Sequence, residues 1–201
     1  MGVIASAVAV PSVRASALRS IGNALVAEDA LAPSDVIVLT VDANGAGILE
    51  ASDLVQRGIS KRVAFFADPL DAADLEFQRR GLPNEDEASN VVRLFGALGV
   101  HDVEEIPVTV NGSEDEARIL PDWADHNRVR SIVLVTSRDH SRRLTRAMRR
   151  AVQGRPIVVR VRSAQLSAFD PDRWWQSRRG LRIGLVELEK LALDVVRHPF
   201  S

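Results

Sequence analysis

The sequence predicts an α/β protein: a three-layer, Rossmann-like fold with a mostly parallel sheet of about five strands. Five short apolar runs alternate with stretches in which apolar residues recur at helical spacing, and this alternation is typical of a parallel sheet covered on both faces. The strongest runs are apolar without interruption, as in strands buried on both sides. With 201 residues, 46% of them hydrophobic and 26% charged, the chain has the composition of an ordinary soluble domain.

The expected strands are short and bounded by turn residues. The second ends at Asp68-Pro69, and Asn111-Gly112 turns the chain out of the third, which is the weakest of the five. In order, the runs cover residues 35–41, 62–67, 106–110, 131–137 and 157–161. The fourth, Ser-Ile-Val-Leu-Val-Thr-Ser, is the clearest candidate for a buried central strand.

Apolar spacing predicts helices between these runs, and capping residues mark several of their ends. Gly58 and Gly99 follow the first two helices as stops. Ser113 has the position of an N-cap, with Glu116 at capping-box spacing, and Pro121 predicts a kink or a restart in the helix that follows. The other helical stretches cover about residues 48–57, 85–98 and 140–152, and a long C-terminal segment that ends near residue 196.

We expect residues 18–201 to form a single domain, preceded by an apolar N-terminal stub at residues 1–17. The apolar run from Val3 to Val10 is far shorter than the roughly 20 residues of a transmembrane helix, and no basic segment precedes it. We therefore expect no complete signal peptide or transmembrane segment, and a location in the cytoplasm or peripheral to the inner membrane. Two interpretations of the stub stay open: a loosely docked terminal segment, or the remnant of a membrane anchor.

The net charge of −1 hides an asymmetry along the chain. Residues 1–127 carry 9 basic and 21 acidic side chains, whereas residues 128–201 carry 17 basic and 6 acidic ones. The arginine-rich part favours an anionic small molecule or a membrane surface as partner, although a solvated helical face can carry the same excess. Nucleic acid is disfavoured, because the chain has no tyrosine and no DNA-binding motif. The absence of cysteine excludes disulfides and thiol chemistry.

In an open parallel sheet, ligands bind outside the carboxyl ends of the strands, near the point where the strand order reverses. This rule selects four loops, at residues 42–47, 68–71, 111–116 and 136–140. The first contains Asn44-Gly-Ala-Gly47, which has the position of a phosphate-binding turn but lacks the third glycine of a dinucleotide fingerprint. It is therefore either a simple strand-to-helix turn or a ligand loop, and a nicotinamide dinucleotide site is not expected.

The segment Thr136-Ser-Arg-Asp-His140 gives the sharpest local signal. Two hydroxyls, a guanidinium, a carboxylate and an imidazole crowd the end of the fourth strand, where a helix N-terminus favours an anion. Arg142 and Arg143 oppose the dipole of that helix, and an anionic ligand accounts for them better than local charge pairing does. The plainer interpretation is that Ser137 or Asp139 caps the helix and that His140 lies at the surface.

These patterns select the candidate site residues. His140, a residue type that titrates near neutral pH, and Ser137 are the catalytic candidates, and Arg143 is expected to clamp negative charge. The other ligand-binding candidates are Asp42, Asn44, Gly45, Ser113, Asp115, Glu116, Thr136 and Arg138. No metal site is expected, because the four histidines show no metal-binding spacing and no cysteine can assist. The Gly-x-Ser-x-Gly elbow of serine hydrolases is absent, and no cofactor or oligomeric state is predicted.

An ordered set of short segments also resembles one known family. An apolar strand leads into Thr136-Ser-x-x-His-x-x-Arg143, preceded by Gly112-Ser-Glu-Asp-Glu-Ala117 and followed by Trp174-Trp175 and Glu187-x-x-Lys190. This order is similar to that of the YdcF/SanA/ElyC-like bacterial family, of largely unknown function, over roughly residues 18–197. The resemblance implies a Rossmann-like fold and, in some members, a nucleotide-type ligand such as S-adenosylmethionine. Other members are linked to envelope and peptidoglycan physiology, often through an N-terminal membrane segment.

The chain departs from that family's pattern at two loops. Where the family has glycines after the first two strands, this chain has Val41-Asp42 and Phe66-Ala-Asp68. Ser113, Asp115 and Glu116 stand where the family has Thr, Glu and Asn. The fourth-strand half of the site is retained while the first loops are remodelled, so a ligand of better-matching members need not bind here.

Two functional hypotheses of different kinds follow. The leading one is a small-molecule-binding or catalytic α/β domain that acts on an anionic ligand, either nucleotide-like or an envelope precursor. The second is a non-catalytic interaction module at an envelope or membrane surface. The basic C-terminal part and the apolar N-terminal stub support the second hypothesis.

Overall fold

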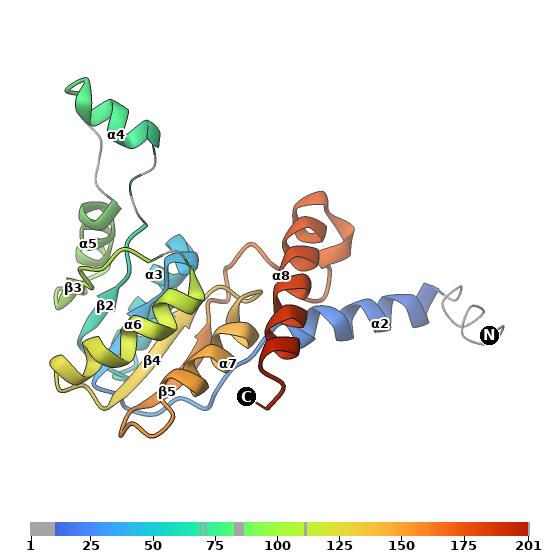
Figure 1. Ribbon diagram of the computed structural model, residues 1–201. Helices are drawn as coiled ribbons and strands as arrows, with labels where there is room; N and C mark the ends of the chain where they lie inside the picture. Colours follow the sequence, from blue (N-terminus) through green and yellow to red (C-terminus); the bar gives the residue numbers. More distant parts are fainter. Residues whose placement is uncertain (1–10, 69, 71, 83–86, 111, 201) are drawn as a thin grey trace.

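A five-stranded sheet forms the centre of the computed structural model, which describes residues 11–68, 70, 72–82, 87–110 and 112–200. Every neighbouring pair of strands is parallel, in the order β3-β2-β1-β4-β5 (Figure 1). The strands are β1 Val36–Leu39, β2 Val63–Phe65, β3 Val103–Glu105, β4 Ser131–Thr136 and β5 Val158–Ser163. The predicted α/β class with a five-stranded, mostly parallel sheet is confirmed.

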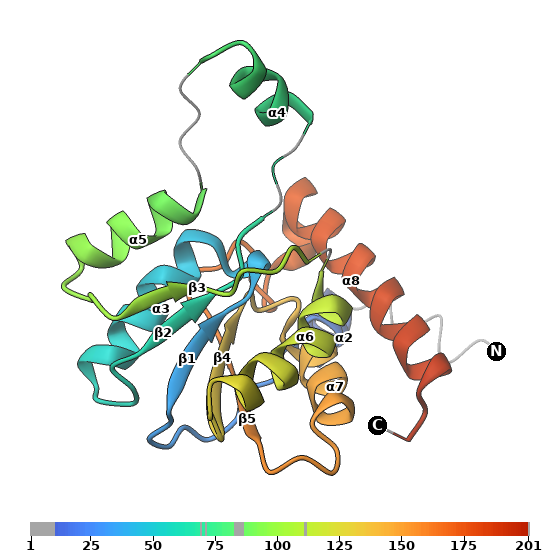
Figure 2. The ribbon, with the colours of Figure 1, turned by 60° about the vertical axis from the view of Figure 1, so that its left-hand side comes forward.

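Helices cover both faces of this sheet (Figures 1 and 2). The helical elements are α2 Pro11–Ala24, the 3-10 turn η1 Val41–Ala43, α3 Asn44–Gln56, α4 Ala72–Arg79, α5 Glu87–Ala97, α6 Ser113–His126, α7 Ser141–Ala151, the 3-10 turn η2 Trp174–Gln176 and α8 Arg178–Arg197. Along β1, Val36 and Val38 share a core with residues of α6 and α7, whereas Ile37 and Leu39 share one with residues of α3 and α5. Because β1 buries side chains in both directions, its sequence is an unbroken apolar run and the fold has the predicted three layers.

The strand order reverses between β1 and β4. The chain moves outward from β1 through β2 to β3 on one side, and from β4 to β5 on the other. Leu39 of β1 is paired with Val135 of β4, so the next residues, Thr40 and Thr136, reach the same edge of the sheet. η1 and the turn before α7 both start there, which makes this edge the position where open α/β sheets bind ligands.

The third strand lies earlier than predicted. β3 covers Val103–Glu105, not residues 106–110. It is an edge strand whose Glu104 pairs with Arg62, at 2.5 Å, so it lacks the apolar run that identified the other strands. The buried side chain of Ile106, just beyond the strand, supplied the misleading signal.

The start of α6 also differs from the expectation. Gly112, with a φ of 108°, is the N-cap, and Ser113 is the first helical residue, so the predicted capping box does not form. A left-handed backbone at that position suits glycine, which carries no Cβ. Pro121 lies inside α6, and the helix continues past it to His126 without the predicted restart.

Two further helices are absent from the sequence prediction. α2 crosses the expected boundary at residue 17 and is attached by Trp174, whose Nε1 donates to the carbonyl oxygen of Leu18 at 2.8 Å. Residues 1–10 of the expected stub lie outside the described residues, as do residues 85 and 86 at the expected start of α5. α4 stands away from the sheet in both views and buries none of its side chains, so it left no apolar signal. No helix in the described part of the chain is both long and apolar enough to cross a membrane.

Candidate functional site

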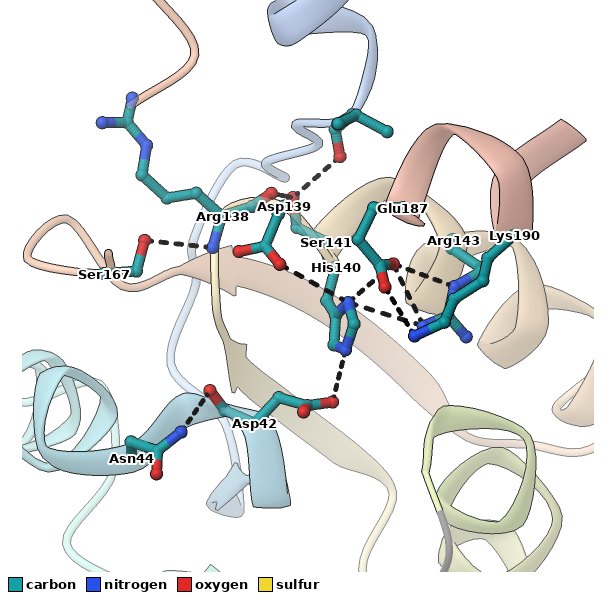
Figure 3. A network of polar contacts seen from close by, with 11 residues as sticks. Asp42, Asn44, Arg138, Asp139, His140, Ser141, Arg143, Ser167, Glu187 and Lys190 are labelled. Atoms are coloured by element: carbon teal, nitrogen blue, oxygen red, sulfur yellow. Dashed lines mark hydrogen bonds and ion pairs between the residues drawn. The ribbon is translucent and has the colours of Figure 1, made fainter. Parts of the chain in front are cut away.

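Three segments meet at the edge between β1 and β4: η1, the turn after β4, and the middle of α8. His140 ends the turn after β4, and its ring lies between two carboxylates (Figure 3). Its Nε2 is 2.6 Å from Oδ2 of Asp42 in η1, and its Nδ1 is 2.7 Å from Oε2 of Glu187 in α8. The fold thus brings the predicted residues Asp42 and His140 together and adds an acid from the far end of the chain.

Glu187 is buried and contacts all three cationic groups of the site. Its side chain is 3% exposed. Besides facing His140, it accepts hydrogen bonds from Nη2 of Arg143 at 3.1 Å and from Nζ of Lys190 at 2.8 Å. Glu187 is not among the site residues predicted from the sequence. The segment Glu187-x-x-Lys190, which contributes to the family resemblance, is the signal that could have identified it.

These contacts fix the charge of His140. Burial alone would lower the pKa of the imidazole, but hydrogen bonds to Asp42 and Glu187 raise that pKa to about 9. Burial would raise the pKa of Glu187, but the hydrogen bond and charge of His140, together with Lys190 and Arg143, lower it to about 2. At neutral pH the site therefore holds an imidazolium ion that donates from both ring nitrogens. Such a group can give a proton or stabilise negative charge, and it cannot accept a proton.

Glu116 reaches the same edge from α6. Its side chain is fully buried, and one carboxylate oxygen accepts a hydrogen bond from the backbone N–H of Val41 at 2.9 Å. Burial raises the pKa of Glu116 to about 7, and the charges of Asp42, His140 and Arg143 act on it as well. Its other oxygen and the buried hydroxyls of Thr40 and Thr136 have no hydrogen-bond partner among the described residues. The edge of the sheet at the carboxyl ends of β1 and β4 therefore contains buried polar groups.

A cavity of about 620 Å³ opens beside this network. Its polar lining consists of Asp42, Asn44, Ser137, Asp139, Ser167 and Arg179. The hydroxyl of Ser137 hydrogen-bonds to Asp139, and burial raises the pKa of that carboxyl group. Because both ring nitrogens of His140 face carboxylates, the described residues contain no Ser137–His140 pair of the kind that activates a serine nucleophile.

The turn after β1 packs closely against the protein and also lines two cavities. Asn44 has a φ of 49°, and its Nδ2 donates to the carbonyl oxygen of Asp42 at 3.0 Å. Asn44 and Gly45 also line a smaller cavity, of about 200 Å³, at the ends of β1 and β2. A Cβ on Gly47 would lie 2.4 Å from the side chain of Ala43, so that glycine allows close packing. The segment is a strand-to-helix turn that borders two cavities.

Three other predicted residues lie around this centre with contacts of their own. Arg138 points away from His140 (Figure 3), and its backbone N–H donates to Oγ of Ser167 at 3.2 Å. Asp115 pairs with Arg118 at 3.1 Å. Ser113 is buried at the first position of α6.

The arginines of α7 have partners within the protein. Arg142 donates to the backbone carbonyls of Ala24 and Val26, at 3.2 and 2.8 Å. Arg146 and Arg150 both pair with Asp194 of α8, at 2.5 and 2.7 Å. Neither Arg142 nor Arg143, for which local charge pairing was not expected, pairs with a neighbouring acid of its own helix: Arg142 contacts backbone carbonyls, and Arg143 pairs with Glu187 of α8. Their partners come from the end of α2 and from α8, which are distant in sequence.

No group of three or more acidic or histidine side chains in the described part of the chain is arranged to hold a metal ion. No protein-family model matches the sequence, and no curated protein is similar to it. The likeness to the YdcF/SanA/ElyC-like family, carried by short segments, stays a prediction.

Proposed function

We propose that this chain binds an anionic small molecule at the edge between β1 and β4, and that His140 acts there as a charged acid. The observation that carries the proposal is the His140 ring, held between Asp42 and Glu187 beside a cavity of about 620 Å³. Burying ions costs several kcal/mol each even when they are paired. A fold that keeps such a cluster at its ligand-binding edge uses it for more than stability.

Asp42 distinguishes a ligand site from a purely structural ion pair. The ion pair of Arg143 with Glu187 joins α7 to α8, and Lys190 pairs with Glu187 within α8, which a structural role would explain. Asp42 belongs to neither helix, its side chain is 38% exposed, and it lines the cavity. A ligand oxygen that takes its place would receive the Nε2–H of a protonated imidazole, the geometry of a general acid or an oxyanion donor.

The ligand class we propose is nucleotide-like or an envelope precursor, in line with the resemblance to the YdcF/SanA/ElyC-like family. The test is a thermal-shift screen of nucleotides and sugar phosphates. His140→Gln should abolish the stabilisation that any hit gives the wild type. His126→Gln, at an exposed position on α6, is the matched control and should keep it. If a ligand stabilises His140→Gln as much as the wild type, and circular dichroism shows that the variant is folded, the proposal is wrong.

A second candidate, a non-catalytic module at an envelope or membrane surface, is favoured by the outer face of α8. Leu185 and Val196 are 57% and 78% exposed there, on a helix that also presents arginines. Anionic vesicles should then retain the protein in a salt-sensitive way, while zwitterionic vesicles should not. Absence of binding to anionic vesicles at low ionic strength dismisses this candidate.

A further inference from the structure

The lining of the cavity beside His140 carries side chains of both charges. Asp42 and Asp139 line it from the loops after β1 and β4, and Arg179 lines it from the first turn of α8. Leu166 and Ile183 add apolar surface to the lining. A lining that contains both carboxylates and a guanidinium suits a ligand that carries both hydroxyls and an oxyanion.

The cavity continues along α8. A neighbouring cavity of about 350 Å³ shares Asp139, Arg179 and Ile183 with it and adds Arg182 and Glu187 to the lining. Because they share wall residues, the two cavities lie next to each other, and Asp139 and Glu187 line the same cavity as Arg182. We call the two cavities together the α8 groove.

The two arginines of the α8 groove differ from those of α7. Neither Arg179 nor Arg182 forms an ion pair with any described residue, and both are exposed. Arg179 lies in the first turn of α8, which contains no acidic residue, and Arg182 follows in the second turn. Cations at this end of a helix oppose its dipole, so the folded chain carries them at a cost in stability. An oxyanion between them would offset that cost.

We propose that the α8 groove binds a polyol that carries an oxyanion, such as a sugar phosphate, with its hydroxyls on Asp42 and Asp139 and its oxyanion on Arg179 and Arg182. Carboxylates accept hydrogen bonds from neighbouring hydroxyls, and a guanidinium fork matches two oxygens of a phosphate. The inference rests on the proposed function, since both concern one site. It adds which side chains hold the hydroxyls of the ligand and which hold its oxyanion.

The experiment compares ligands that differ only in the phosphate: ribose 5-phosphate with ribose, and adenosine 5′-monophosphate with adenosine. Calorimetry should find the phosphorylated member of at least one pair bound at least tenfold more tightly by the wild type. The double variant Arg179→Gln/Arg182→Gln should remove that difference. Arg178→Gln, in the same helical turn but outside both cavities, should preserve it. Asp42→Asn should weaken both members of the pair alike.

A second readout separates ligand binding from a structural role. Without ligand, the double variant should melt at or above the temperature of the wild type, because two cations leave the positive end of the helix. A double variant that keeps the preference for phosphate, while His140→Gln weakens both ligands, overturns the anion subsite and leaves the proposed function standing. Equal affinity of the wild type for both members of each pair overturns it too. Failure of every compound in the wider screen counts against the proposed function itself.

Discussion

At the scale of single residues, the site is a cluster of charged side chains that come from three parts of the sequence. Asp42, His140 and Glu187 lie about 100 and 50 residues apart along the chain, yet one imidazole touches both acids. Removing one member of a buried ion cluster leaves the others unpaired, which commonly costs 3–5 kcal/mol. The cluster therefore couples the ligand edge to the packing of α8, because Glu187 serves both.

The buried carboxyl group of Glu116 gives the first prediction. Its pKa is about 7 in the folded chain, above the ordinary value of 4.5, so between these pH values the unfolded chain loses a proton that the folded chain keeps. This group therefore stabilises the fold fully below pH 4.5, and that contribution is lost as the pH rises through 7. Glutamine does not titrate, so Glu116→Gln does not lose this contribution. As the pH rises from 4.5 to 7, the free energy of unfolding of the variant should increase relative to that of the wild type by on the order of 3 kcal/mol.

Urea denaturation at several pH values measures this difference. Glu114→Gln, at an exposed position on the same turn of α6, is the control. A difference between Glu116→Gln and wild type that stays constant with pH would contradict the burial of an acid at this position.

Part of the arrangement of this centre could be predicted from the sequence, for a physical reason. Thr136 ends β4, and Asp42 and His140 follow strand ends, so the parallel topology alone brings them to one edge of the sheet. Glu187 could not be found this way, because it lies in the middle of a helix and no strand-end rule applies to it. The partners of Arg142 and Arg143 could not be identified either, because they are distant in sequence.

At the scale of elements, Trp174 joins α8 and α2. Its indole ring is buried, and glycines let both helices approach it: a Cβ on Gly22 would lie 2.7 Å from the ring, and a Cβ on Gly184 would lie 2.5 Å from it. The position of α8 therefore depends on small residues facing one indole. Since α8 carries Glu187, this contact also positions the acid that holds His140.

Gly184→Ala tests this packing. The added methyl meets the Trp174 ring, and overpacking of this kind should destabilise the fold by about 1–3 kcal/mol. Gly96→Ala, at a helical glycine of α5 with open space around its Cβ position, should instead stabilise the fold by about 0.5–1 kcal/mol. Chemical denaturation should therefore show a lower free energy of unfolding for Gly184→Ala and a higher one for Gly96→Ala. Equal changes in the two variants would contradict the close packing of Gly184 against Trp174.

Elements with a buried apolar pattern were predictable, and the others were not. β1 and the four central residues of β4 are apolar because both faces of these strands are covered, whereas β3 is a short polar edge strand and was misplaced. α4 was missed because none of its side chains is buried. Hydrophobic periodicity indicates which face of an element is buried, so it gives no signal for a helix that does not pack on the core.

At the scale of the whole molecule, the charge asymmetry of the sequence is partly cancelled by the fold. Arg162 of the basic part pairs with Glu28 and Glu50 of the acidic part, and Arg155 pairs with Asp122 and Asp125. The acidic and basic parts of the chain therefore contact each other through ion pairs. Arg179 and Arg182 take no part in this pairing, and they line the α8 groove.

The separation of α4 from the sheet gives a prediction at this scale. Replacing the eight residues Ala72–Arg79 with glycine and serine should change the free energy of unfolding by less than about 1 kcal/mol, because no side chain of α4 is buried. Urea denaturation of this variant is the measurement. A loss of more than about 2 kcal/mol would mean that α4 packs against the rest of the molecule.

The edge between β1 and β4 holds an imidazole that is charged at neutral pH. An NMR pH titration of the four histidine rings, with the His140 signal assigned by its disappearance in His140→Gln, measures this directly. We expect His140 to titrate with a pKa of about 9, and Glu187→Gln to lower this pKa. A His140 ring that titrates at or below the ordinary value of 6.5 would show that the imidazole is not held in its charged form.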